Sequence, residues 1–153
     1  NPDLIRRMIK EGHVVGNHSV THPAAGLPSQ SIDTQAEELM ALHRYVKENF
    51  DYDMYLFRYP AGIHSDQSLA LVQQLGYKSV FWSFAYKDWV DDAQPDTANA
   101  LKTISERSHP GMIMLLHSTS ATNAQVLDEV LTAWEEMGYR FEPIAHLFSP
   151  PDT

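Results

Sequence analysis

The chain has 153 residues, 43% of them hydrophobic, and a formal net charge of −9 from 11 Lys and Arg against 20 Asp and Glu. The hydrophobic content is ordinary for a globular protein, and the negative charge argues against non-specific binding to nucleic acid or to anionic membranes. The absence of cysteine excludes a disulfide framework and a thiolate metal site. No apolar run approaches the ~18 residues of a membrane span.

Predicted helices and strands alternate along the whole chain. The first helix is capped by Asn1 and ends near Gly12. Later helices are expected to begin at Asp33, at Ser65 or Asp66, at Asp96 and at Asn123. Apolar runs predict short strands at residues 14–17, 55–57, 78–83, 112–116 and 139–141. Residues 144–148 are expected to pack the end of the chain.

This alternation indicates an α/β fold with a parallel sheet and right-handed crossovers. We interpret residues 1–153 as one domain, because no linker, repeat or low-complexity tract divides them. The chain opens on a helix and without a methionine. We therefore expect it to be an N-terminally incomplete part of a longer protein, with one or more N-terminal strands missing.

Two histidines directly after the first predicted strand are candidate metal ligands. His18 and His22 are four residues apart, and Pro23 fixes a turn beside them. Neutral imidazole nitrogens suit zinc and similar ions. Among eight histidines this spacing also arises by chance, so two exposed loop histidines are the alternative. A catalytic zinc site usually needs a third protein ligand.

Three further reactive side chains each follow an apolar, strand-like run: Arg58, Asp88 and His117. Such residues at the carboxyl ends of successive parallel strands are typical of the active site of an α/β barrel. Taken singly, a lone Arg more often forms a surface ion pair, an Asp after a strand is often a turn former, and a His ending a strand is more often a core residue. The occurrence of all three residues after apolar runs favours the active-site interpretation.

Other notable side chains receive the plainer interpretation. Core packing is the more frequent role for the three tryptophans, Trp82, Trp89 and Trp134, and for Trp134 especially. No functional role is predicted for the remaining histidines, His13, His43, His64, His109 and His146.

Four blocks, in this order, resemble the motifs of the polysaccharide deacetylase family, the chitooligosaccharide deacetylase homology domain. They are the metal-binding histidine motif at 18–23, the Arg-x-Pro-x-Gly motif at 58–62, Asp-Trp at 88–89 and Leu-x-His at 115–117. Order and strand-end placement agree from about residue 1 to about residue 147. The resemblance implies a distorted (β/α) barrel with parallel strands.

Within this family, the chain is most similar to the bacterial muramic-acid deacetylases that prepare peptidoglycan for δ-lactam formation in the spore cortex. The strings that carry this similarity lie at residues 1–5, 8–13, 76–83 and 109–111. None of them is a catalytic motif, so they support the branch less firmly than the four blocks support the family.

The resemblance implies hydrolysis of N-acetyl amides on cell-wall glycan, outside the cytoplasm of a bacterium. A divalent metal ion, expected to be zinc, would be held by His18 and His22. His117 would protonate the departing amine, Asp88 would hold a catalytic partner, and Arg58 would position the base. The remaining implied roles are the oxyanion contact, from the Ala61 N–H, and the walls of the acetyl pocket, from Trp89 and Leu115.

One departure from the family pattern is serious. The Asp-Asp or Asp-Asn motif, which supplies the general base and usually the third metal ligand, has no match here; Asp3 precedes a helix and Asp33 opens one. A rival interpretation is therefore a non-catalytic glycan-binding module that keeps the groove without the base. A second rival is a small metal-binding scaffold with no sugar substrate.

Overall fold

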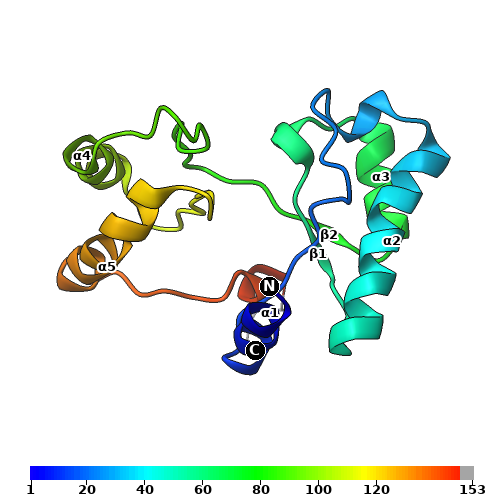
Figure 1. Cartoon of the computed structure of the whole chain (residues 1–153), viewed down its shortest axis with the longest axis horizontal. Helices are drawn as coiled ribbons and strands as arrows, with labels where there is room; N and C mark the ends of the chain where they lie inside the picture. The colour runs from blue at the N-terminus through cyan, green and yellow to red at the C-terminus, as the bar shows by residue number, and fades with distance from the viewer. Residues whose placement is uncertain (149–153) are drawn as a thin grey trace. The chain divides into compact units, whose positions relative to one another are not determined.

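The computed structural model describes residues 1–148 and divides the chain into two compact units, Asn1–Phe81 and Trp82–Thr153. The first unit contains helices α1 (Pro2–Lys10), α2 (Ile32–Phe50) and α3 (Asp66–Gln74), strands β1 (Leu56–Phe57) and β2 (Lys78–Ser79), and the short 3-10 helices η1 (Leu27–Ser29) and η2 (Pro60–Gly62). The second contains α4 (Thr97–Arg107), α5 (Ala121–Glu136) and the 3-10 helix η3 (Ile144–Phe148). Figure 1 shows the course of the chain.

Every strand contact in the described residues is parallel, as the alternating pattern predicts. β1 pairs with β2 in the register Leu56↔Lys78, and Asn17 forms an isolated parallel bridge to Phe57. In the second unit, Phe84 forms a parallel bridge to Met114. The two units thus carry short pieces of parallel pairing, while closure into a barrel stays a prediction.

The strands are shorter than predicted. The segments 14–17 and 112–116 each pair through one bridge, and 78–83 is a strand only at Lys78–Ser79. An apolar run indicates that a segment is buried. Buried segments can be extended without pairing to a neighbour, so the run does not fix the number of residues in a strand ladder. Residues 139–141 form no strand, because the Tyr139 N–H donates to the Trp134 carbonyl at 2.9 Å and closes the end of α5.

Two helix starts differ from the prediction by a few residues. The N-cap of α2 is Ser31, whose side chain accepts from the Thr34 N–H, so Asp33 lies inside the first turn. The N-cap of α5 is Ser120, which accepts from the Asn123 N–H. In both cases an earlier serine offers the capping oxygen. The predicted caps at Asp96 and at Ser65 are confirmed, and Ser65 forms a capping box.

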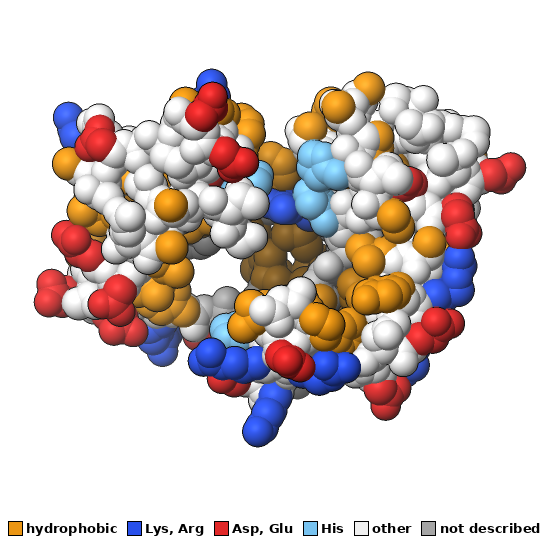
Figure 2. Space-filling model, in the orientation of Figure 1, with side chains coloured by type: hydrophobic (Ala, Val, Ile, Leu, Met, Phe, Trp, Pro, Cys, Tyr) orange, Lys and Arg blue, Asp and Glu red, His pale blue; other side chains and the backbone are white. Residues whose placement is uncertain are grey.

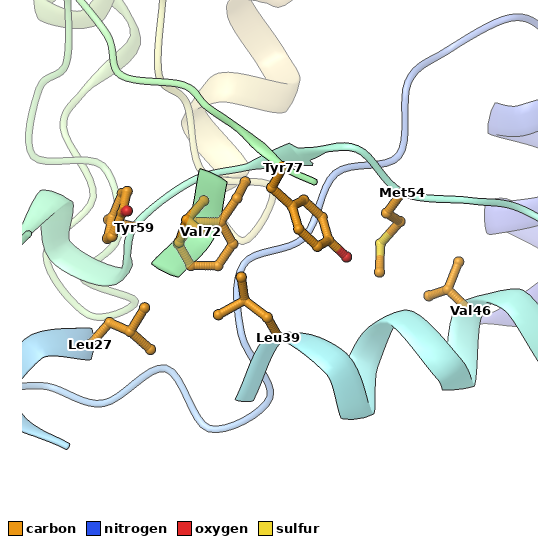
Figure 3. Packing of buried hydrophobic residues seen from close by; sticks show 8 residues of the cluster. Leu27, Leu39, Val46, Met54, Tyr59, Val72 and Tyr77 are labelled. Atoms are coloured by element: carbon orange, nitrogen blue, oxygen red, sulfur yellow. The ribbon is translucent and has the colours of Figure 1, made fainter. Parts of the chain in front are cut away.

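Each unit has its own apolar core. In the first unit, α2, α3, η1 and the strand region enclose a cluster formed by Leu27, Leu39, Val46, Met54, Phe57, Tyr59, Val72 and Tyr77. Figure 3 shows side chains of this cluster converging from these elements. In the second unit α4 packs against α5 over Phe84, Ala100, Ile104, Val126, Val130 and Trp134. Trp134 is thus a core residue, as predicted. η3 has no buried residue, so the expected packing of the chain end is not observed there.

Candidate active site

The loop that carries both candidate metal ligands leaves the sheet at Asn17. This residue is buried; its backbone N–H donates to the Leu56 carbonyl at 2.8 Å, beside β1. Its side-chain amide donates to the Leu39 carbonyl at 2.8 Å and to the Tyr77 hydroxyl at 3.0 Å, and its Oδ1 accepts from the Ser19 N–H at 2.9 Å. The start of the loop is therefore anchored in the core of the first unit.

The rings of His18 and His22 lie edge to face, with centroids 4.9 Å apart. The His18 Nδ1 lies 2.6 Å from the Arg58 carbonyl oxygen. A carbonyl can only accept, so Nδ1 carries the proton and Nε2 holds the lone pair. Ligand histidines in metal sites have this arrangement, with the second ring nitrogen donating to a carbonyl or carboxylate. Figure 2 shows histidine side chains gathered on the surface of the first unit.

The histidine loop has a strained backbone. Ser19 (φ 66°) and His22 (φ 48°) are both in the left-handed region, which side chains other than glycine rarely adopt. The Ser19 hydroxyl accepts from the His22 N–H at 3.1 Å and so joins the two strained positions. Strain of this kind persists only where the surroundings impose it, and it is concentrated at functional sites.

Glu38 on α2 is a supporting residue that the sequence analysis missed. Its carboxylate accepts from the backbone N–H groups of Val20 (3.0 Å) and Thr21 (2.8 Å) and from the Thr21 hydroxyl (2.8 Å). Burial raises the pKa of Glu38, but the hydrogen bonds from Thr21, Val20 and Ser19 together outweigh it, so the pKa lies below its ordinary value. The only sequence signal was a carboxylate one residue before a core leucine of α2.

The Arg-x-Pro-x-Gly segment continues directly from β1. The Arg58 N–H donates to the Asn17 carbonyl at 3.0 Å, which places this segment beside the histidine loop. Tyr59 is buried and stacks on Phe81, with centroids 5.6 Å apart. Ala61 is exposed and has a left-handed φ of 54°. Within residues 1–148 its N–H has no hydrogen-bond acceptor. The role of this N–H as an oxyanion contact stays a prediction.

In the second unit the buried Asp88 pairs with the partly exposed imidazole of His117. Asp88 is 0% exposed. Its Oδ1 lies 2.6 Å from the His117 Nδ1, and its Oδ2 accepts from the His117 backbone N–H at 2.8 Å. The carboxylate thus fixes the Nδ1–H tautomer and directs Nε2 away from itself. The His117 side chain is 30% exposed, so it is not the fully enclosed core histidine of the alternative interpretation.

Two amide side chains complete the surroundings of Asp88, and neither was predicted. Asn123, in the first turn of α5, donates to the Asp88 Oδ2 at 2.6 Å, and its own Oδ1 accepts from the Tyr86 hydroxyl. Gln94 donates to the Asp88 carbonyl at 2.9 Å. The sequence predicted only that a helix begins at Asn123, and this local pattern gives no sign of its contact with Asp88.

The structure assembles the predicted residues in two groups, one in each unit. His18, His22 and the Arg58 backbone lie together in the first unit, and Asp88 and His117 lie together in the second. Trp89 is 52% exposed with its ring 5.4 Å from that of His117, and Leu115 is half-buried beside Phe84, to whose carbonyl its N–H donates. The meeting of all these residues in one groove stays a prediction.

The two histidines are a partial ligand set for a metal ion. The tautomer of His18 and the proximity of the two rings fit an ion that prefers imidazole, such as zinc. Within the described residues 1–148, however, no group of three His, Asp or Glu side chains could hold a metal ion. The same part of the chain contains no helix long and apolar enough to cross a membrane.

Comparison with known proteins agrees with this arrangement. The family model described as polysaccharide deacetylase matches residues 1–80. The peptidoglycan-N-acetylmuramic acid deacetylase PdaA of Bacillus subtilis is 38% identical over 95% of this chain, and a peptidoglycan-N-acetylglucosamine deacetylase of Bacillus cereus is 30% identical over 96%. The chain spans 55% of PdaA and 68% of the second relative.

Solved structures give the same result. The structure of PdaA, called a family 4 carbohydrate esterase, has a TM-score of 0.89 at 36% identity; the match covers 96% of this chain and 62% of PdaA. A mutant of BA3943 from Bacillus anthracis, called a family 4 pseudoenzyme with restored enzymatic activity, has a TM-score of 0.86 at 25% identity, with 97% and 53% covered. The chain belongs to the polysaccharide deacetylase family.

Proposed function

We propose that this chain is a metal-dependent hydrolase domain that removes N-acetyl groups from bacterial cell-wall glycan, outside the cytoplasm. The observation that carries the proposal is the pair of adjacent imidazoles at 18 and 22, with the His18 tautomer set by the Arg58 carbonyl. The relatives named as peptidoglycan deacetylases support the substrate class. Likeness to PdaA favours N-acetylmuramic acid, and with it a role in sporulation, over N-acetylglucosamine.

His18 and His22 would hold the divalent ion, for which the resemblance to the family and the imidazole donors favour zinc. The chemistry that such an ion supplies when bound is polarisation of the amide carbonyl and acidification of water. The Ala61 N–H would donate to the developing oxyanion. The sequence has no match for a third protein ligand or for a base that accepts the proton of the attacking water. Arg58 would position such a base where one is supplied.

Release of the amine is the step for which the chain has both of its candidate residues, Asp88 and His117, in contact. Asp88 holds the Nδ1–H of His117. In its imidazolium form, with a proton on each nitrogen, His117 would give the Nε2 proton to the departing nitrogen and return to the neutral Nδ1–H form. A buried carboxylate in this position keeps the imidazole oriented and stabilises its charged form while that form exists. Trp89 and Leu115 would form the walls for the acetyl methyl group.

A non-catalytic glycan-binding module is the second candidate, and two observations favour it. No Asp-Asp or Asp-Asn motif of the family type occurs in the sequence, and no third metal ligand joins the histidines within residues 1–148. A similar structure is that of a mutant called a family 4 pseudoenzyme with restored enzymatic activity, which supports considering a non-catalytic candidate. The two candidates share the glycan and differ in the base.

Acetate release from N-acetylated peptidoglycan and from chitooligosaccharide, with and without a chelator, separates them. We expect this chain to be slow, because loss of a positioned base costs about 10²–10⁴-fold in rate. A version restored with an upstream strand that carries the Asp-Asp or Asp-Asn motif of the family should be active and chelator-sensitive, and His117→Ala should suppress that activity. Full chelator-sensitive activity of the 153-residue chain would show that its base has been misplaced. An inactive extended version that still binds glycan would favour the binding module.

A further inference from the structure

We infer that Glu38 on α2 is a positioning residue that holds the loop of residues 18–22 in the conformation in which its two imidazoles meet. Its consequence for metal binding rests on the proposed function. The geometric basis of the inference is independent of that function, because every contact that supports it is made between side chains and backbone of the first unit.

The Glu38 carboxylate binds the part of the loop that lies between the two histidines. Its Oε2 accepts from the Val20 and Thr21 N–H groups at 3.0 and 2.8 Å, and its Oε1 accepts from the Thr21 hydroxyl at 2.8 Å. Hydrogen bonds to an ionised acceptor are roughly twice as strong as neutral ones. One side chain therefore binds three donors of two consecutive residues. His22 directly follows this stretch, and His18 lies two residues before it.

The loop needs such support, because its backbone is unfavourable by itself. Ser19 and His22 flank the stretch bound by Glu38, and both have a left-handed φ. Without an external acceptor, the Val20 and Thr21 N–H groups would bond to water equally well in relaxed conformations. Those conformations would let the His22 ring turn away from the His18 ring.

α2 is a rigid base for this contact. The next residue of the helix, Leu39, is fully buried, and its carbonyl accepts from the Asn17 side chain at 2.8 Å. Two consecutive residues of one helix therefore hold the loop on both sides of His18, through Asn17 and through residues 20–21. Residues on a regular element position a site more precisely than residues on a loop.

Three substitutions separate positioning from a general effect on α2. Glu38→Ala removes the acceptor. Glu38→Gln keeps one oxygen for the two N–H groups and turns its amide toward the Thr21 hydroxyl, which can accept. The matched control is Glu37→Ala, because Glu37 is a neighbouring carboxylate of the same helix that bonds to Arg44 and is exposed.

The first measurement needs no metal: amide hydrogen exchange at Val20 and Thr21, and the NMR signals of the His18 and His22 rings, in the full chain. We expect Glu38→Ala to accelerate exchange at both amides and shift both ring signals, Glu38→Gln to restore most of the protection, and Glu37→Ala to change neither. Unchanged exchange in a folded Glu38→Ala variant overturns the inference. If that variant does not fold, Thr21→Val decides, because it removes only one donor: faster exchange at Val20 supports the inference, and unchanged exchange overturns it.

The second measurement is Zn²⁺ binding by calorimetry. Loss of a residue that orients metal ligands costs about 10–100-fold in affinity, so we expect about a tenfold loss for Glu38→Ala and most of the affinity retained in Glu38→Gln. If the wild-type chain takes no zinc but the amide exchange responds as expected, the proposed metal site fails and the positioning role stands. If zinc binds to wild type and to Glu38→Ala with equal affinity, the positioning role fails and the metal site stands.

Discussion

The histidine loop of the first unit and the Asp88–His117 pair of the second use the same side chain with different partners. In both, Nδ1 carries a proton that it donates to an oxygen. His18 donates to a neutral backbone carbonyl, and His117 donates to a fully buried carboxylate. A carbonyl fixes the tautomer without favouring a charge, which suits a ligand, whereas a carboxylate also stabilises an imidazolium, which suits an acid.

The two regions also place their carboxylates differently. Glu38 binds backbone groups of the histidine loop and touches the imidazoles only through them. Asp88 binds its imidazole directly and is itself held by Asn123. Loss of Glu38 should therefore change the conformation of the histidine loop. Loss of Asp88 should destabilise the fold, because it leaves buried donors without an acceptor. Substitutions in each region should therefore have different effects.

The largest expected effect is that of Asp88→Ala. This change leaves the His117 N–H, the His117 ring and the Asn123 amide without their buried acceptor, and breaking a buried pair costs about 3–5 kcal/mol of unfolding free energy. Urea denaturation followed by tryptophan fluorescence measures the loss of unfolding free energy in the second unit, since all three tryptophans lie there.

The control for Asp88 is Asp91→Ala, a nearby exposed aspartate whose loss should change stability by no more than about 0.5 kcal/mol. Asp88→Asn tests the tautomer separately. Its amide would face the Nδ1–H, so we expect the His117 proton to move to Nε2, as read from ¹⁵N ring shifts. An unchanged tautomer in the Asn variant would contradict the role given to this carboxylate.

The second effect, in the first unit, is that of Gly26→Ala. Gly26 has a φ of +80°, and an added Cβ would lie 2.4 Å from the Cβ of Ile63, just after the Arg-x-Pro-x-Gly segment. Strain and overpacking together should cost about 3 kcal/mol. Gly12→Ala is the control, since Gly12 has a similar φ of +85° with nothing within 4 Å, and should cost about 1 kcal/mol. Equal losses in urea unfolding, followed by first-unit NMR signals, would show that the close packing of Gly26 against Ile63 does not contribute to stability.

A smaller loss is expected for Asn123→Ala. It removes the amide that donates to the Asp88 Oδ2 and to the His117 carbonyl and that accepts from the Tyr86 hydroxyl. The two hydrogen bonds between Asp88 and His117 stay in place, so we expect a loss of about 2 kcal/mol by the same fluorescence measurement. Asn99→Ala is a closely matched control: Asn99 also donates its N–H to the N-cap side chain of its helix, but it is exposed and bonds only to Asp96. If both variants lose equal stability, Asn123 acts as a helix-start residue and not as support for Asp88.

The candidate site residues stand out in the sequence more clearly than the residues that support them. His18, Asp88 and His117 could be proposed because each follows an apolar run, a pattern that depends only on neighbouring residues. Glu38 and Asn123 act on residues 17 to 35 positions away. Nothing local distinguishes Glu38 from the exposed Glu37 beside it, and only the fold decides which of the two faces the loop.

The same distinction holds for the fold. Helices were predicted well because caps and periodicity are local; Asp96 and Ser65 cap as expected, and the errors at Asp33 and Asn123 are only two or three residues. Strand lengths were overestimated, because a ladder depends on a partner segment that the run itself does not specify. The segment at 139–141 shows the limit, since its first N–H is taken by the end of α5.

The smallest expected effect is a pH dependence of the contribution that Glu38 makes to the unfolding free energy. Hydrogen bonds from Thr21 and Val20 outweigh burial, so the pKa of Glu38 in the folded chain lies below its ordinary value of 4.5. A group with a lowered folded pKa contributes stability that is fully present above its unfolded pKa and is lost as the pH falls through the folded pKa. The difference in unfolding free energy between wild type and Glu38→Gln should therefore be constant near neutrality and shrink below about pH 4.5.

Urea unfolding at a series of pH values from 7 to 3, followed by NMR signals of the first unit, measures this difference. Glu37→Gln removes the same charge from the same helix without touching the loop, so it corrects for the change in net charge. A difference that grows as the pH falls would mean that Glu38 is held in its neutral form. The loop would then depend on the shape of this side chain and not on its charge, and the contrast with the charged partner of His117 would be sharper still.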